Sequence, residues 1–245
     1  MVKNSAFNVF QKVKYRGASR EYVAKLNEIG GWLSRHEASI FVLVDEYQKT
    51  HGITGYLAEL GVWHGRGAIL LQHLRRPDEQ VYAIDIFDLR KPTHSHFNDP
   101  AIFLANVEKY GPDRHVNLVK IDTSTHPEAL AQSVPVSGCR LFHVDGGHEY
   151  RSVRHDMEFA ASTLSDGGVM VCDDVLAKKF PGVTQALIET LLAHPGLAPF
   201  AISTKKAWVS SRDMADLYRQ HLVERCLGGK FRTTEFMGSD CLILP

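Results

Sequence analysis

The sequence predicts a single large α/β domain built on a doubly wound, mostly parallel β-sheet. At 245 residues the chain suits one large domain better than two, since domains usually hold about 100–200 residues. Hydrophobic residues make up 44% of the chain and charged residues 23%, which is typical of a globular protein. From Tyr56 onward, short apolar runs alternate with longer amphipathic runs, and this indicates parallel strands joined by helices on both faces of the sheet. We expect residues 1–34 to form a helical or irregular segment and residues 35–245 to form the domain.

The first predicted elements are two helices. One covers residues 19–29. The other begins at Ser34, because Ser34 and Glu37 have the spacing of a capping box, and apolar residues follow at helical spacing as far as Gly52.

Five strand-like runs come next, with helices between and after them. The predicted strands are Tyr56–Leu60, Gln80–Ile84, Val116–Ile121, Arg140–Val144 and Gly168–Cys172. The predicted helices are Gly67–Leu74, Pro100–Tyr110, His126–Gln132, Glu149–Leu164, Gly182–Leu192 and Arg212–Cys226. Two later runs, 198–203 and 207–210, predict a hairpin, and the tail 241–245 could add a last strand or cover an edge.

Charge and hydropathy exclude several classes of protein. Lys and Arg number 28 and Asp and Glu also number 28, so bulk positive charge for nucleic-acid binding is absent. The pairs 178–179 and 205–206 are lysines, which we interpret as solvated charges. The longest apolar runs, such as 40–44, fall far short of the roughly 18 residues that a membrane span needs. The first residues lack the apolar core of a signal peptide, so we expect a cytoplasmic protein without membrane partners.

The cysteines predict neither a metal ribbon nor a redox dithiol. Cys139, Cys172, Cys226 and Cys241 are widely spaced, with no C-x-x-C pair. Cys139 and Cys172 adjoin apolar runs, where a buried, reduced thiol is expected.

The turn after the first predicted strand has the composition of a ligand-binding loop. Gly61 and Gly65 let the chain turn tightly and let a ligand approach the backbone. Asp85 closes the next strand, where a carboxylate can accept hydrogen bonds from a ribose diol. We therefore predict a cofactor that contains a nucleoside; an ordinary tight turn is the alternative.

Two cofactors compete for this loop. The dinucleotide pattern G-x-G-x-x-G is only partly met, because Leu70 stands where the third glycine belongs. Glu59, just before the turn, would repel a pyrophosphate but attract the ammonium group of an amino-acid-bearing cofactor. The charge argument favours S-adenosylmethionine over NAD.

These residues resemble the nucleotide motifs of the class I S-adenosylmethionine-dependent methyltransferases, over about residues 31–192. The matching residues are Glu59-Leu-Gly61 with Gly65, then Asp85, then Asp122-Thr123. Two further segments, 142–150 and 167–174, are similar to the macrocin-type (macrolide-sugar) and related natural-product O-methyltransferases. The resemblance implies a seven-stranded Rossmann-like sheet. Trp63 is a departure, because many members of the superfamily carry another glycine there.

The resemblance also implies which residues bind the cofactor. Glu59 and the turn would line the methionine part, Asp85 would bind the ribose hydroxyls, and Asp122 would lie near the adenine. The full predicted set is Glu59, Gly61, Trp63, Gly65, Asp85, Asp122, Thr123 and Asp145.

Three carboxylates are predicted to meet at one edge of the sheet. Asp145 ends the fourth strand, and Asp173 and Asp174 end the fifth; neighbouring strands lie about 4.8 Å apart. Carboxylates this close repel one another unless a cation lies among them, and hard cations such as Mg²⁺ prefer oxygen ligands. In the macrocin-type enzymes the matching acidic residues hold a divalent ion, although some relatives have Glu-Asp where this chain has Asp-Asp. The alternative is that the acidic pair caps a turn and that Asp145 pairs with Arg151 or Arg154.

His148, three residues after Asp145, is the predicted catalytic base. Methyl transfer from a sulfonium needs an aligned nucleophile that has lost its proton, and an imidazole beside the acceptor hydroxyl can take that proton. In some sugar O-methyltransferases a histidine at the matching position is the proposed base. A solvated loop histidine is the alternative.

The leading hypothesis is therefore a divalent-metal-assisted O-methyltransferase that acts on a hydroxyl of a small molecule, such as a sugar or another natural product. We expect chelation of the metal to remove its activity. Metal-independent methylation of nitrogen or carbon, or an S-adenosylmethionine-binding protein without its own chemistry, are the alternatives. Acceptor specificity is expected in the first thirty residues, in the loop 94–98 and after Lys178. The amino-terminal segment and the helix at 212–226 offer surfaces for a homo-oligomer.

Overall fold

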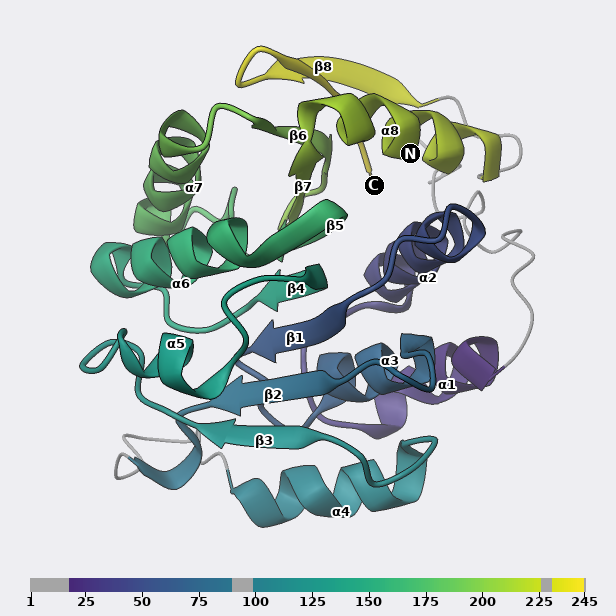
Figure 1. Cartoon of the computed structure of the whole chain (residues 1–245), viewed down its shortest axis with the longest axis vertical. Helices are drawn as coiled ribbons and strands as arrows, with labels where there is room; N and C mark the ends of the chain where they lie inside the picture. The colour runs from purple at the N-terminus through teal and green to yellow at the C-terminus, as the bar shows by residue number, and fades with distance from the viewer. Residues whose placement is uncertain (1–17, 90–98, 226–230, 245) are drawn as a thin grey trace, which may run out of the picture.

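The computed structural model describes residues 18–89, 99–225 and 231–244, which form a mixed nine-stranded sheet with helices on both faces (Figure 1). The strand order is β3-β2-β1-β4-β5-β7-β6-β9-β8. The strands are β1 (Tyr56–Leu60), β2 (Val81–Asp85), β3 (Asn117–Lys120), β4 (Cys139–Val144), β5 (Leu164–Cys172), β6 (Leu197–Ile202), β7 (Ala207–Ser211), β8 (Arg232–Phe236) and β9 (Ser239–Ile243). The doubly wound, mostly parallel sheet is confirmed, but the prediction of seven strands is wrong by two.

The two extra strands form a hairpin at the far edge of the sheet. β8 and β9 pair antiparallel, and β9 pairs parallel with β6. The predicted contribution of the tail is confirmed, since Leu242 of β9 is buried against Ala201 of β6. β8 was not predicted, because its side chains are mostly exposed and carry no apolar run.

The switch in strand order lies between β1 and β4. From β1 the chain proceeds to β2 and β3 on one side, and β4 and β5 lie on the other; the pairings among these five strands are parallel. Their carboxyl ends therefore lie at one edge, where ligands bind in open α/β sheets. The arrowheads of β1, β2 and β3 mark this edge at the left of Figure 1.

Helices cover both faces of the sheet, with one hydrophobic cluster on each face. The helices are α1 (Ala18–Lys25), α2 (Arg35–Thr50), α3 (Arg66–Leu74), α4 (Pro100–Tyr110), α5 (Ala129–Ser133), α6 (Tyr150–Thr163), α7 (Pro181–Ala193) and α8 (Arg212–Arg225). Buried residues of α1, α2, α3, α4 and α8 belong to one cluster, and those of α5, α6 and α7 to the other.

The predicted helix start at Ser34 is confirmed in detail. The Ser34 hydroxyl accepts from the Glu37 amide at 3.1 Å, and the Glu37 carboxylate accepts from the Ser34 amide at 2.9 Å. Cys139 and Cys172 are buried free thiols, as predicted, and burial raises the pKa of Cys139 to about 12. Cys226 lies outside the described residues, as does the loop 94–98.

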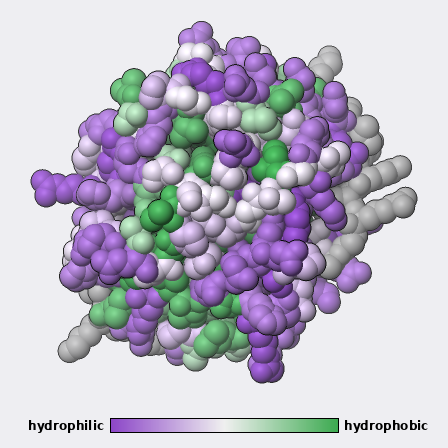
Figure 2. Space-filling model, viewed as in Figure 1, coloured by the Kyte–Doolittle hydropathy of each residue, from purple (hydrophilic) through white to green (hydrophobic). Residues whose placement is uncertain are grey.

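Residues 18–34 pack into the same core as the sheet. Tyr22, Leu26 and Ile29 are buried in the cluster that contains α2 and α3, and the Tyr22 hydroxyl donates to the Arg66 carbonyl at 2.6 Å. On the face seen in Figure 2, hydrophilic and hydrophobic residues are interspersed. No helix within the described ranges combines the length and apolarity that a membrane crossing would require.

Candidate active site

A cleft of about 950 Å³ lies at the carboxyl ends of the parallel strands. Its walls come from the segments that follow β1, β2, β3, β4 and β5, and from residues 30–33. Small-molecule sites usually occupy about 300–1,000 Å³, so this cleft is large enough for a cofactor with a second small molecule. Every predicted cofactor residue except Gly65 lines it, together with the predicted base and all three predicted metal ligands: Glu59, Gly61, Trp63, Asp85, Asp122, Thr123, Asp145, His148, Asp173 and Asp174.

The turn after β1 requires glycine at Gly61. Gly61 has a φ of 90°, and a Cβ there would lie 1.9 Å from the Asp145 carbonyl oxygen. Trp63 also has a positive φ, of 50°, so it adopts the backbone conformation that the more usual glycine would take. Its indole stacks on the His64 ring at 4.6 Å and faces the cleft near Trp32. The turn thus keeps its shape despite the tryptophan.

Gly65 supports the cleft from behind. It has a φ of 95° and is the N-cap of α3, and a Cβ there would lie 2.9 Å from the Phe103 ring. Gly67, in the first turn of α3, lies against the Glu59 carboxylate: a Cβ on Gly67 would be 1.9 Å from Glu59 Oε1. Both glycines allow α3 to pack closely behind the cofactor turn.

The two carboxylate oxygens of Glu59 differ in their hydrogen bonding. Its Oε1 lies 2.7 Å from His143 Nδ1, whereas its buried Oε2 has no hydrogen-bond partner among the described residues. A buried carboxylate oxygen without a donor is costly, and a ligand ammonium group in the cleft would satisfy it. Glu59 therefore fits the role predicted for it.

Asp85 organises the loop that follows β2 and still faces the cleft. One carboxylate oxygen accepts from the Trp63 amide at 2.9 Å and the other accepts from the Phe87 amide at 2.9 Å. An ionised carboxylate offers about four lone-pair sites, so further bonds to a ribose diol are compatible with both amides.

The predicted adenine-side residues are adjacent to the same cleft. The Asp122 carboxylate accepts from the Ser124 hydroxyl at 2.7 Å and from the Ser124 amide at 3.2 Å, and Thr123 is buried beside it. These bonds fix the turn after β3.

Arg66 attaches residues 29–33 to the start of α3. Its guanidinium donates to the Leu33 carbonyl at 3.0 Å and to the Ile29 carbonyl at 2.9 Å. Gly30, Gly31 and the segment that follows thereby become one wall of the cleft. Neither the charge pattern nor the periodicity of the sequence pointed to Arg66.

The carboxyl ends of β4 and β5 hold a buried cation that the sequence analysis missed. Lys206, which precedes β7, is 1% exposed, and its Nζ lies 2.7 Å from Asp173 Oδ2 and 2.9 Å from His143 Nε2. The prediction that Lys206 is a solvated charge is wrong. The available signal was its position directly before an apolar run, which became β7.

Charges in this cluster shift one another. Desolvation and then the Asp173 carboxylate raise the pKa of Asp145 well above its usual value. Desolvation also acts on Asp173, but the Lys206 ammonium holds the pKa of Asp173 below its usual range. The pKa of Lys206 is raised, because Asp173 and Asp145 outweigh desolvation. Asp173 and Lys206 therefore form an ion pair beside the Asp145 carboxyl group, whose pKa is raised.

The structure brings only two of the three residues expected to bind a divalent ion into one group of potential ligands. Among the described residues, ligand atoms of His143, Asp145 and Asp173 lie within 4.8 Å of one another, but Asp174 is not part of this group. His143 and Asp173 both contact the Lys206 ammonium, which an incoming dication would have to displace or approach against repulsion. Among the described residues, Asp145 forms no ion pair with either alternative partner, Arg151 or Arg154, and Arg154 pairs with Glu158 and Glu189 instead.

Asp174 lies against His148 instead. His148 Nε2 is 2.9 Å from Asp174 Oδ2, and the imidazole stacks on the Phe180 ring at 3.9 Å. An ionised carboxylate only accepts hydrogen bonds, so Nε2 carries the proton and Nδ1 of the neutral ring keeps its lone pair. The His148 side chain is 39% exposed at the rim of the cleft, where it can reach a bound molecule.

Comparisons with known proteins agree with this geometry. Residues 58–175 match the family model for a methyltransferase domain. No curated protein sequence matches the chain.

Solved structures share the fold over most of the chain. An O-methyltransferase from Bacillus cereus in complex with SAH is similar with a TM-score of 0.60 and 13% identity, over 84% of this chain and 96% of that chain. The O-methyltransferase TomG from Streptomyces achromogenes, in complex with SAM, has a TM-score of 0.59 and 14% identity, over 84% and 94%. CalS11, a TDP-rhamnose 3'-O-methyltransferase, has a TM-score of 0.51 and 19% identity, over 82% and 97%.

Residues 58–175 therefore form a methyltransferase domain, and the chain has the fold of solved O-methyltransferases. Both findings support the resemblance found in the sequence and an S-adenosylmethionine-dependent methyltransferase.

Proposed function

We propose that the protein transfers a methyl group from S-adenosylmethionine to a hydroxyl of a small molecule, such as a sugar or another natural product, with His148 as the base. The observation that carries this proposal is the His148–Asp174 contact of 2.9 Å at the rim of the cleft. It leaves Nδ1 of the imidazole available as the proton acceptor. The O-methyltransferases with the same fold support the choice of a hydroxyl.

The cleft residues divide the binding work. Glu59 would accept from the ammonium group of the cofactor, Asp85 from its ribose, and Asp122 with Thr123 would lie beside its adenine. When bound, S-adenosylmethionine supplies an electrophilic methyl group on a sulfonium. The Phe180 ring, stacked on His148, holds the imidazole at the acceptor side of the cleft.

The reaction needs alignment and one proton transfer. A C–O bond forms to the acceptor oxygen as the C–S bond of the cofactor breaks, and the hydroxyl proton passes to His148 Nδ1. Asp174 stabilises the resulting imidazolium through its contact with Nε2. No step of this proposed reaction uses a divalent ion.

The test replaces His148 and measures two quantities. We expect His148→Ala to lower methyl transfer to hydroxyl acceptors about 10²- to 10⁴-fold, as general-base removal usually does, while the affinity for S-adenosylhomocysteine stays unchanged. His115→Ala is the matched control, because that histidine is exposed before β3, at the opposite edge of the sheet. Full activity of His148→Ala, or transfer to amine acceptors alone, would contradict the proposal.

A further inference from the structure

The Lys206 ammonium group is fixed in place by a tight turn. The Lys206 amide donates to the Ser203 hydroxyl at 2.9 Å, and the Ser203 amide donates to the Lys206 carbonyl at 2.7 Å. This turn joins β6 to β7 and directs the lysine side chain under the carboxyl ends of β4 and β5, where it is 1% exposed. A buried ammonium is costly unless it is paired and hydrogen-bonded, and here both conditions are met.

The contacts of Lys206 determine the proton positions of its neighbours. An ammonium group has no lone pair, so in its 2.9 Å contact with His143 it must be the donor and His143 Nε2 the acceptor. The proton of the neutral imidazole is then on Nδ1, from which it donates to Glu59 Oε1 at 2.7 Å. A continuous line of hydrogen bonds thus runs from Glu59 through His143 and Lys206 to Asp173.

We propose that the Lys206 ammonium permanently supplies the positive charge that a divalent ion would otherwise bring to Asp145 and Asp173, so that this cleft binds no divalent ion there. The charge arrangement supports it: the ammonium contacts the Asp173 carboxylate at 2.7 Å and belongs to the chain itself. Mg²⁺ needs near-octahedral oxygen ligation at about 2.0–2.1 Å. Asp173 and His143 belong to the only group of three potential ligands found among the described residues, and both already contact the ammonium, through Asp173 Oδ2 and His143 Nε2.

This proposal rests on the proposed function only in treating the cleft as the methyl-transfer site, and its test does not need the acceptor.

Mn²⁺ is the probe, and free Mn²⁺ is measured by electron paramagnetic resonance during titration of the full-length protein. We expect the wild type to leave Mn²⁺ free. Lys206→Met, which leaves the carboxylates without their cation, should raise Mn²⁺ affinity by about tenfold or more, the scale on which residues next to metal ligands change affinity. Adding Asp173→Asn to Lys206→Met should abolish the gain.

Stoichiometric Mn²⁺ binding by the wild type that Asp173→Asn removes would overturn the proposal. A folded Lys206→Met protein without increased affinity would overturn it as well. Lys206→Gln, which keeps a hydrogen-bond donor without the charge, makes the same prediction if the methionine variant does not fold. S-adenosylhomocysteine binding, measured separately by calorimetry, tests the proposed function: its absence would contradict that function and would not alter the Mn²⁺ result.

Discussion

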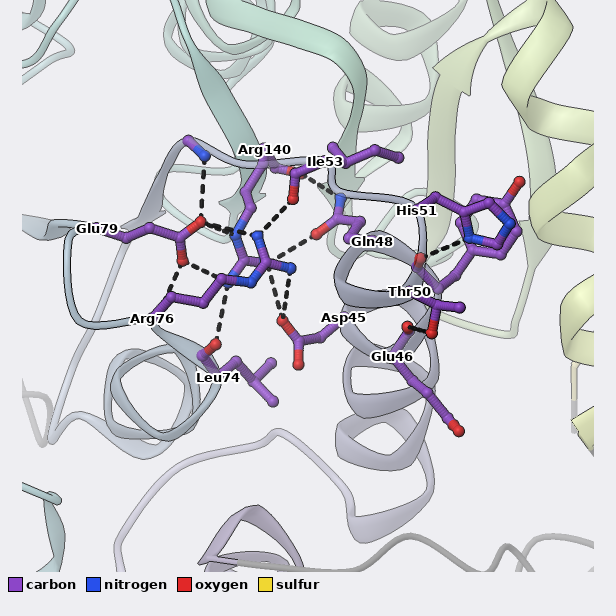
Figure 3. A network of polar contacts seen from close by, with 12 residues as sticks. Asp45, Glu46, Gln48, Thr50, His51, Ile53, Leu74, Arg76, Glu79 and Arg140 are labelled. Carbon is purple, nitrogen blue, oxygen red and sulfur yellow. Dashed lines mark hydrogen bonds and ion pairs between the residues drawn. The ribbon is translucent and has the colours of Figure 1, made fainter.

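The two ends of strand β4 carry two buried networks of charged side chains, of which only the one at the carboxyl end lines the cleft. At the amino end, Arg140 is fully buried (Figure 3). Its Nε and Nη2 each lie 2.8 Å from an oxygen of Glu79, and Nη2 also donates to the Leu74 carbonyl at 3.0 Å. Its Nη1 lies 2.7 Å from Gln48 Oε1 and 2.9 Å from Asp45 Oδ1. Each nitrogen of the guanidinium therefore has a hydrogen-bond or ion-pair partner within the protein, although Asp45 Oδ1 itself accepts no hydrogen bond among the described residues.

At the carboxyl end of β4 the network is incomplete. Glu59, His143, Lys206 and Asp173 form a line of short contacts, but Glu59 Oε2 has no partner within the described part of the chain. The comparison indicates that the amino end is a structural tie between β4 and its neighbours, while the carboxyl end keeps bonding capacity for a ligand.

The largest expected effect is on stability, at the amino end. Arg140→Met should lower the free energy of unfolding by about 3–5 kcal/mol, because Glu79 and Asp45 would lose their fully buried cation and keep only the partly exposed Arg76. Urea denaturation followed by circular dichroism measures the loss. Arg154→Met is the control: its pair with Glu158 is partly exposed and should change stability by about 1 kcal/mol or less. Equal losses in the two variants would remove the distinction between a buried tie and a surface pair.

The next effect is on binding, at the carboxyl end. Glu59→Gln keeps an acceptor for His143 but loses the charge that faces the cleft. Affinity for S-adenosylhomocysteine should fall about tenfold to hundredfold, which corresponds to the roughly 1.5–3 kcal/mol of a charged hydrogen bond. Isothermal titration calorimetry measures it, with Glu108→Gln on an exposed part of α4 as the control. Unchanged affinity in Glu59→Gln would show that this carboxylate does not contact the cofactor.

The next prediction concerns the pH dependence of stability and the buried carboxyl group of Asp156, which lies near the carboxyl end of β4. Burial raises the pKa of Asp156, on α6 below Gly146, to about 7. Between about pH 4 and pH 7 the Asp156 carboxyl is protonated in the folded state and ionised in the unfolded state. The contribution of Asp156 to the free energy of unfolding therefore falls as the pH rises from about 4 to about 7. Its slope can reach about 1.4 kcal/mol per pH unit. Asp156→Asn should flatten the pH dependence of unfolding measured from pH 4 to pH 8; an unaltered profile would mean that Asp156 titrates normally.

The smallest expected effect is that of chelation. Because the Lys206 ammonium already pairs with Asp173, methyl transfer should keep the same rate after treatment with EDTA. The sequence alone predicted the opposite, that chelation removes activity. A rate that EDTA abolishes and Mg²⁺ restores would favour the original expectation.

Local patterns in the sequence predicted most of the fold. β1 and α4 were predicted with their observed bounds, and the other predicted elements differ by a few residues, because apolar periodicity and caps are local signals. β8 was missed since its side chains are largely exposed and its strand pairing depends on β9.

The site was predicted unevenly for a related reason. Residues at strand ends, such as Asp85 and Asp145, are recognisable because parallel strands bring their carboxyl ends together. Lys206 and His143 are separated by 63 residues, and β7 enters the sheet antiparallel beside β5. Nothing local indicates that this strand returns a lysine to the acidic cluster, so its role required the structure.

The most direct test of the central claim is calorimetric titration of the wild-type chain with S-adenosylhomocysteine. The cleft beside the unpartnered oxygen of Glu59 should take up one equivalent of this demethylated cofactor. If no heat of binding and no competition by S-adenosylmethionine can be measured, the assignment of the carboxyl end of β4 as a cofactor site is contradicted.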